Sequence, residues 1–238
     1  MPRVFIGVGH GYDPATGKGD PGAVGNGLKE SEVNLTISLA MQAELIRHGI
    51  TVGMSRIKEE TDPLSEEIRE ANAFAPDVAV EVHTNAGGGD GFEVYRQTNG
   101  HAAKSSVLAK AIEKRVLEIG QNSRGVKTLK SGSVDYFGWL REVKAPAVLT
   151  ECAFIDNKTD VQIIDTVEEQ RMFGIAYAKG ILDYFGIWWK PSAKVMYGVV
   201  GQKIALPDKA AAEKYASELN KNEKDGWYWK VIEIGGLT

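Results

Sequence analysis

Two histidines and two glutamates lie beside short apolar segments of the chain. His10 follows the run VFIGVG, and His83 ends the run VAVEVH. Glu151 lies within PAVLTECAF, and Glu30 begins a helical pattern after a glycine-rich loop. Buried imidazoles and carboxylates are costly unless something engages them. Two imidazoles and one carboxylate with an open fourth position are typical of a hydrolytic zinc site, and a second carboxylate supplies the proton transfer.

The elements that must position these side chains alternate along the first 185 residues. Short β-branched runs predict strands and longer amphipathic segments predict helices, which is typical of an α/β domain with a mainly parallel twisted sheet and helices on both faces. The predicted strands are 4–9, 51–56, 78–83, 92–97 and 146–154, and the predicted helices are 30–48, 65–74, 102–119 and 159–185. Because the carboxyl ends of parallel strands meet at one edge, His10, His83 and Glu151 should converge there. Glu30 should join them from the first turn of its helix.

Composition excludes several classes of protein. The chain has 238 residues, of which 43% are hydrophobic and 25% charged, as in ordinary globular proteins. Its net charge of −4 argues against a nucleic-acid partner. The single cysteine, Cys152, excludes an intrachain disulfide framework and is expected in the core. The first residues enter an apolar strand without the longer run of a signal peptide or membrane span, so we expect synthesis in the cytoplasm and no membrane insertion.

A second, smaller module is predicted at the C-terminal end. The segment GIWWKPSAK breaks the pattern and divides the chain into a first domain (1–186), a linker (187–194) and a module (195–238). The pattern of the module predicts a βαβ unit, with strands 195–206 and 227–234 on either side of helix 208–220. Residues 190–238 carry eight lysines against six acidic residues. Such a unit is marginal alone, so it should pack on the first domain or pair with a second copy in a homodimer.

Four strings of the sequence carry a resemblance to a known family. They are VGHGYD with DPGAVG, LKESEVNLTISLA, VAVEVHTNAG with GFEVY, and LREVKAPAVLTECAFIDNKTD. In the same order they resemble the zinc-dependent N-acetylmuramoyl-L-alanine amidases of the type-3 amidase family, over about residues 1 to 185. The resemblance implies zinc bound by His10, Glu30 and His83, with Glu151 as the catalytic carboxylate.

Details of the match bear on the ligand assignment and on substrate fit. Glu30 rather than Glu32 corresponds to the family's ligand, because it stands five residues before Leu35 in an E-x-x-x-x-L pattern. Residues 12–19 lengthen the first loop, and Glu81 stands where the family often has Ser. Ala153 likewise stands where Gly is common. None of these departures removes a ligand, so they concern substrate fit rather than chemistry.

The resemblance also implies a reaction and a place of action. Zinc would lower the pKa of a bound water, and Glu151 would take its proton and return it to the leaving amine. The substrate would be bacterial peptidoglycan, cleaved between N-acetylmuramic acid and L-alanine. Without an export signal, the enzyme would reach the wall as phage endolysins do, through holin pores, or by lysing a sporulating mother cell. We favour the endolysin, with residues 195–238 binding the cell wall or dimerising.

Simpler explanations exist for the individual ligands. His10 could cap a strand in a polar loop, and Glu30 could stand at the first helical turn for the macrodipole alone. Glu151 could belong to a buried ion pair within an otherwise apolar strand. Only the joint pattern favours a metal site over these explanations.

Three neighbouring features of the sequence allow two interpretations each. Glu81 shares a strand face with His83, so it either orients that imidazole from behind or pairs with an arginine. Asn85 either shapes the site or touches substrate. The aromatic cluster at 136–139 either lines the substrate groove or packs in the core.

Three rival functions are compatible with parts of the sequence. Another zinc-dependent amide or peptide hydrolase would use the same residues. A non-catalytic wall-binding protein would need none of the proton transfer. A nucleotide-binding protein is suggested by GVGHG after the first strand, but Tyr12 replaces the third glycine of GxGxxG.

Overall fold

The computed structural model describes residues 1–191, 195–199, 205–206, 213–214 and 231–236 of the chain. It divides into two compact units, Met1–Trp189 and Lys190–Thr238. Within the described residues, no helix combines the length and the apolar character needed to cross a bilayer.

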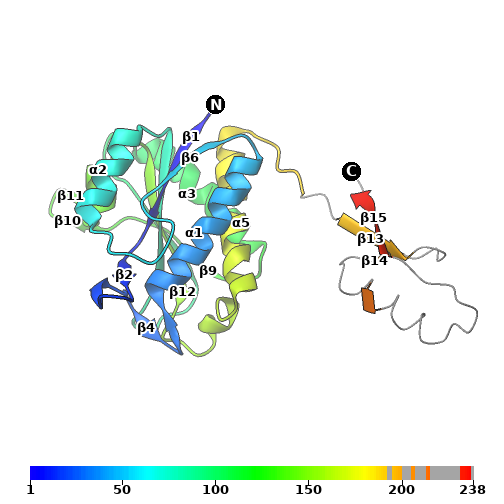
Figure 1. Cartoon of the computed structure of the whole chain (residues 1–238). Coiled ribbons are helices and arrows are strands. Elements are labelled where there is room, and N and C mark those ends of the chain that lie inside the picture. The colour runs from blue at the N-terminus through cyan, green and yellow to red at the C-terminus, as the bar shows by residue number, and fades with distance from the viewer. Residues whose placement is uncertain (192–194, 200–204, 207–212, 215–230, 237–238) are drawn as a thin grey trace, which may run out of the picture. The chain divides into compact units, whose positions relative to one another are not determined.

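A six-stranded sheet forms the centre of the first unit (Figure 1). In spatial order its strands are β6 (Thr51–Met54), β1 (Arg3–Val8), β7 (Val78–Asn85), β12 (Ala147–Phe154), β8 (Phe92–Arg96) and β9 (Ser123–Lys127). The first four strands run parallel, whereas β8 pairs antiparallel with β12 and parallel with β9. The prediction of a mainly parallel sheet is therefore confirmed.

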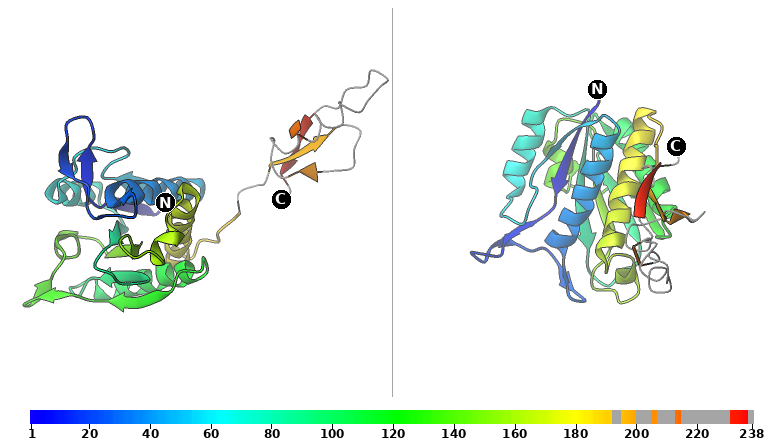
Figure 2. Two further views of the ribbon diagram at one scale, coloured as in Figure 1. Left: turned by 90° about the horizontal axis from the view of Figure 1, so that it is seen from below. Right: turned by 45° about the vertical axis from the view of Figure 1, so that its right-hand side comes forward.

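Helices cover both faces of this sheet, as predicted (Figure 2). The long helices α1 (Glu30–Arg47), α3 (Ala102–Leu117) and α5 (Val167–Phe185) pack together on one face, while α2 (Leu64–Phe74) and α4 (Gly138–Glu142) lie on the other. Successive strand residues point to opposite faces, so Ile6 joins the larger core under α1 and α5 and Phe5 the smaller core under α2 and α4. The face under α2 and α4 carries His83 and Glu151 of the site described below.

The five predicted strands and four predicted helices are present, with shifted ends. Strand β7 continues to Asn85, so His83 lies inside the strand rather than at its end, contrary to the prediction. The predicted helix 159–185 is divided into a 3₁₀ turn at Asp160–Ile163 and helix α5. The division occurs because Thr166 caps α5 in a reciprocal arrangement with Glu169. Strand β9 and the short helix α4 were not predicted.

The glycine-rich loop after β1 folds into two small hairpins. The first pairs β2 (Gly11–Asp13) with β3 (Lys18–Asp20), and the second pairs β4 (Val24–Gly25) with β5 (Leu28–Lys29). A third hairpin, β10 (Lys130–Ser131) with β11 (Val134–Asp135), lies before α4. The first two hairpins bring the chain from His10 to Glu30.

The described parts of the second unit form a three-stranded antiparallel sheet. Its order is β14 (Ala205–Leu206), β13 (Val195–Val199) and β15 (Val231–Gly236). The predicted strand 195–206 thus corresponds to two antiparallel strands instead of one. The predicted helix 208–220 lies outside the described residues except for 213–214, which are helical.

Candidate metal centre

His10 stands immediately beyond β1 in a left-handed backbone conformation. Its φ of 62° is uncommon for a residue with a side chain, and such conformations are concentrated at functional sites. The buried guanidinium of Arg56 fixes this bend, because its Nε donates a hydrogen bond of 2.9 Å to the His10 carbonyl oxygen. The neighbouring Gly9 donates its amide to Val82 O at 3.0 Å, which ties the bend to β7.

Glu30 is the first residue of α1 and is 5% exposed. Two backbone amides bind its carboxylate: Thr84 N donates to Oε1 at 3.0 Å and Ala23 N donates to Oε2 at 2.9 Å. A carboxylate is also favoured at a helix N-terminus by the macrodipole. These contacts hold both oxygens of Glu30 at the carboxyl edge of the sheet.

His10, Glu30 and His83 converge as predicted. Each offers a ligand atom, and these atoms all lie within 4.8 Å of one another. Nδ1 of His83 is 2.9 Å from Glu30 Oε1, and Nε2 of His10 is 3.4 Å from Glu30 Oε2. The two rings stand edge to face with centroids 5.0 Å apart. Two imidazole nitrogens and a carboxylate at this spacing can share one divalent cation.

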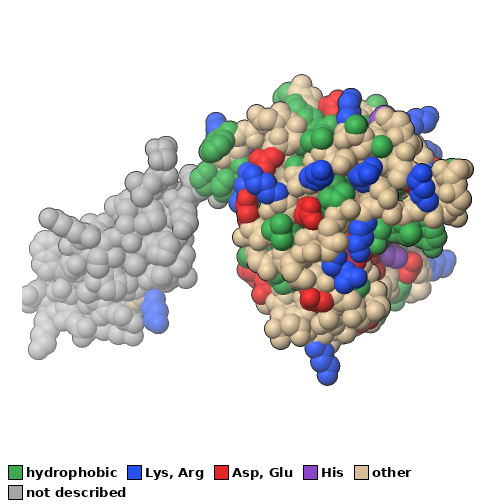
Figure 3. Space-filling view, turned by 180° about the vertical axis from the view of Figure 1, so that it is seen from behind, with side chains coloured by type: hydrophobic (Ala, Val, Ile, Leu, Met, Phe, Trp, Pro, Cys, Tyr) green, Lys and Arg blue, Asp and Glu red, His purple; other side chains and the backbone are tan. Residues whose placement is uncertain are grey.

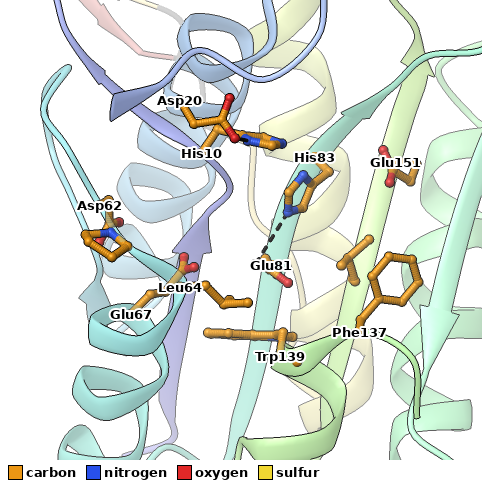
Figure 4. Close-up of a pocket in the computed structure, with 13 residues that line it drawn as sticks. His10, Asp20, Asp62, Leu64, Glu67, Glu81, His83, Phe137, Trp139 and Glu151 are labelled. Carbon is orange, nitrogen blue, oxygen red and sulfur yellow. Dashed lines mark hydrogen bonds and ion pairs between the residues drawn. The ribbon is translucent and has the colours of Figure 1, made fainter. Parts of the chain in front are cut away.

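Each imidazole contacts a further carboxylate through its other nitrogen (Figure 4). Asp20 Oδ2 is 2.9 Å from Nδ1 of His10, and Glu81 Oε1 is 3.4 Å from Nε2 of His83. Such carboxylates fix ring orientation and tautomer in metal sites. The sequence left two interpretations of Glu81, a contact with the imidazole of His83 or a pair with an arginine. The structure contains the first of these contacts. Sequence reasoning did not identify Asp20, although it lies in the quoted string DPGAVG.

The electrostatics of the cluster favour a positive charge at its centre. Burial alone would lower the pKa of His83, but hydrogen bonds to Glu30 and Glu81 raise it well above its usual value. Burial alone would raise the pKa of Glu30, but hydrogen bonds to His10 and His83 hold it well below its usual value. A bound divalent cation would supply the positive charge that this arrangement stabilises.

Glu151 lies beside the cluster on the neighbouring strand. Its Cα pairs with that of His83 in the β7–β12 register, so both side chains start from the same face of the sheet. Its Oε2 is buried and has no hydrogen-bond partner within the described chain. Burial is the largest of the causes that raise its pKa to about 8. A carboxyl with such a pKa can both accept and return a proton near neutral pH.

A cavity of about 380 Å³ lies beside His10, His83 and Glu151 (Figure 4). His10, His83 and Glu151 line one side, and acidic and apolar side chains line the remainder: Asp20, Asp62, Pro63, Leu64, Glu67, Glu81, Phe137, Gly138, Trp139 and Leu149. Trp139 is fully buried, so this member of the aromatic cluster both packs in the core and lines the cavity. Tyr136, in contrast, is 56% exposed and is not part of the lining.

Two further candidates from the sequence lie outside the cavity lining. The amide of Asn85 is 3.4 Å from Glu93 Oε2, so it joins a polar network beside Glu151. Cys152 is buried in the larger core, where its Sγ is 3.3 Å from Thr84 Oγ1. Burial also raises the pKa of the Cys152 thiol, which agrees with its expected place in the core.

Comparison with known proteins identifies similar sequences over most of the chain. The family model described as N-acetylmuramoyl-L-alanine amidase matches residues 4–183. A sporulation-specific N-acetylmuramoyl-L-alanine amidase of Bacillus subtilis is 32% identical over 219 residues, covering 91% of this chain and 80% of its own. An endolysin of Bacillus phage SPP1 is 32% identical over 233 residues, covering 95% and 79%.

A solved structure shows the same similarity in three dimensions. Cwp6 from Clostridium difficile superposes with a TM-score of 0.72 at 34% sequence identity. The match covers 77% of this chain and 29% of that one.

Proposed function

The chain belongs to the N-acetylmuramoyl-L-alanine amidase family and is a peptidoglycan amidase; from this premise we propose that it is a zinc hydrolase in which Glu151 moves the proton. The cleaved bond joins N-acetylmuramic acid to L-alanine. The observation that carries the proposal is the convergence of His10, Glu30 and His83 beside a buried, unpartnered oxygen of Glu151.

The donor set suits zinc. Zinc commonly binds three protein ligands chosen from imidazole and carboxylate and keeps one position for water. His10, Glu30 and His83 supply this set, and carboxylates behind both imidazoles leave His10 Nε2 and His83 Nδ1 facing Glu30. Bound there, zinc would acidify a water molecule and polarise the amide carbonyl of the substrate.

The residues of the chain would then carry the proton. Oε2 of Glu151 takes the proton of the attacking water, because it is buried and unpartnered on the strand next to His83. As the carbon–nitrogen bond breaks, the same oxygen returns the proton to the nitrogen of L-alanine. Asp20 and Glu81 hold the two imidazoles in place throughout.

A product assay distinguishes this reaction from that of another zinc amide or peptide hydrolase. Purified walls are digested, and the released fragments are identified by mass spectrometry and by labelling of new amino termini. Free L-alanine amino termini with intact glycan strands are expected. New termini at any other stem residue would identify a peptidase instead.

Metal dependence tests the zinc assignment and excludes a non-catalytic wall-binding protein. We expect one zinc per chain by elemental analysis, loss of turnover on chelation, and recovery when zinc is returned. Turnover that survives complete removal of metal would overturn the assignment.

We further propose that residues 190–238 bind the cell wall and that the enzyme acts as an endolysin. The phage relative covers 95% of this chain, so its similarity extends beyond the first 189 residues. An excess of lysine in this segment would suit the anionic polymers of a wall. Release from a host cell through a holin and pairing of two copies through this segment belong to the same proposal. Light scattering of the full chain tests the pairing.

A further inference from the structure

A second group of charged side chains lies on the strands beyond Glu151. The backbone register pairs His83 with Glu151 across β7 and β12, and Glu151 with Glu93 across β12 and β8. The three residues therefore form a row on one face of the sheet. Beyond Glu93, the edge strand β9 carries Arg124 and Lys127. The row runs from the metal ligands toward a pair of cations.

Glu93 forms ion pairs with both Arg124 and Lys127. Its side chain is 5% exposed, and its Oε1 accepts hydrogen bonds of 2.5 Å from Arg124 Nε and from Lys127 Nζ. Its Oε2 accepts the hydroxyl of Tyr95 at 2.8 Å and the amide of Asn85 at 3.4 Å. Burial alone would raise the pKa of Glu93, but the hydrogen bonds from Lys127, Tyr95 and Arg124 hold it below its usual value. One carboxylate thus binds two cations.

Both cations retain donors for a second anion. The side chains of Arg124 and Lys127 are 43% and 30% exposed. Arg124 uses Nε for Glu93, and its two Nη atoms have no hydrogen bond to any described residue. The ammonium of Lys127 has three protons, so it too can bind another acceptor. Lys and Arg side chains are scattered among acidic and apolar ones over the face of the molecule seen from behind (Figure 3).

We propose that Arg124 and Lys127 bind the free α-carboxylate of the second residue of the stem peptide, and so select among stem peptides. The inference rests on the proposed function, which sets the cleaved bond beside Glu151. Two strand spacings separate β12 from β9, roughly 10 Å. Two residues of extended peptide span up to roughly 7 Å, and the long cationic side chains cover the difference. In peptidoglycan this carboxylate occurs either free or as an amide, so the pair distinguishes a charged substrate from a neutral one.

The test uses two soluble N-acetylmuramoyl tetrapeptides that differ only at the second residue. One carries D-isoglutamate with a free α-carboxylate and the other D-isoglutamine. The full-length, zinc-loaded enzyme should prefer the acid by about tenfold in kcat/KM, a preference of the size that charge-assisted hydrogen bonds provide. In Lys127→Gln and in the double variant with Arg124→Gln, the ratio should fall toward one.

Matched variants separate this role from general effects of charge and of folding. Lys130→Gln removes an exposed lysine on the neighbouring hairpin and should leave the ratio unchanged. Arg124→Lys keeps the charge and should retain most of the preference. A wild-type ratio near one, or a double variant that keeps the wild-type ratio, would overturn the inference.

Failure of the proposed function gives a different result. If the wild type cleaves neither peptide, the reaction is wrongly assigned, and the binding of both peptides is measured by calorimetry on Glu151→Gln. Tighter binding of the acid that disappears with Lys127→Gln would support the carboxylate site. Equal binding of acid and amide would overturn it.

Discussion

Gly9 and His83 approach so closely that no side chain fits between them. A Cβ added to Gly9 would lie 2.4 Å from Nε2 of His83 and 2.7 Å from the carbonyl oxygen of Val82. The imidazole therefore occupies the space that any other residue at position 9 would need. The orientation of one proposed metal ligand, His83, thus depends on the absence of a side chain next to the other, His10.

Gly9→Ala should consequently lower amidase activity by at least about a hundredfold, because displacement of a ligand by about 1 Å has such an effect. Zinc content and hydrolysis of soluble muropeptides measure it. Gly100→Ala is the matched control, since a Cβ there has open space around it. Wild-type zinc content and activity in Gly9→Ala would show that the site adapts.

Glu151→Gln should retain zinc and lose wall lysis by at least about a hundredfold, because an amide cannot accept the proton of water. Glu151→Asp should also fail, since it retracts the carboxylate by roughly 1 Å. Glu66→Gln, an exposed carboxylate on α2, is the control. Near-normal lysis by Glu151→Gln would remove Glu151 from its proposed role.

Asp20→Asn should weaken zinc binding by about ten- to a hundredfold, as loss of a carboxylate behind a ligand imidazole does elsewhere. Its Oδ2 is 2.9 Å from Nδ1 of His10. Competition with a fluorescent chelator measures the affinity. Asp13→Asn changes a carboxylate of the same hairpin that binds Ala15 and Thr16 instead, so it reports on loosening of the hairpin alone. Equal effects of the two substitutions would contradict a specific role of Asp20.

Arg56→Lys should destabilise the metal-free protein by about 2–4 kcal/mol, because lysine cannot replace the several hydrogen bonds of a buried guanidinium. Arg56 donates to the carbonyl oxygens of Val8, His10 and Ser31. Urea unfolding measures the difference. Arg69→Lys, whose side chain is 66% exposed, is the control and should have little effect.

Removal of residues 190–238 should leave hydrolysis of soluble muropeptides unchanged and weaken binding to whole walls. The first unit ends at Trp189 and contains the whole candidate metal centre. Sedimentation with purified walls measures binding. Unchanged sedimentation of the shortened chain would reject a wall-binding role for this segment.

The sequence predicted the parts of the molecule that follow a periodic pattern. Apolar runs located five strands of the large sheet, and the convergence of His10, Glu30 and His83 follows from parallel strands that end at one edge. Strand β9 escaped prediction because SRGVK combines charged residues with a glycine and lacks an alternating apolar face.

Residues that act through tertiary contacts could not be found in this way. Asp20 reaches His10 only because the glycine-rich loop folds into a hairpin, and Arg56 reaches the His10 carbonyl only because β6 pairs with β1. Neither contact leaves a periodic signal in the sequence.

The two outermost strands of the large sheet, β6 and β9, flank the candidate metal centre on opposite sides. Arg56, just beyond β6, holds the bend at His10, whereas Arg124 and Lys127 stand on β9 at the other side. Edge strands have one neighbour and open more readily than central ones. If Arg124 and Lys127 have the role proposed above, substitutions in β9 change the choice of stem peptide and leave the proposed zinc ligands and Glu151 in place, because those residues lie on other elements.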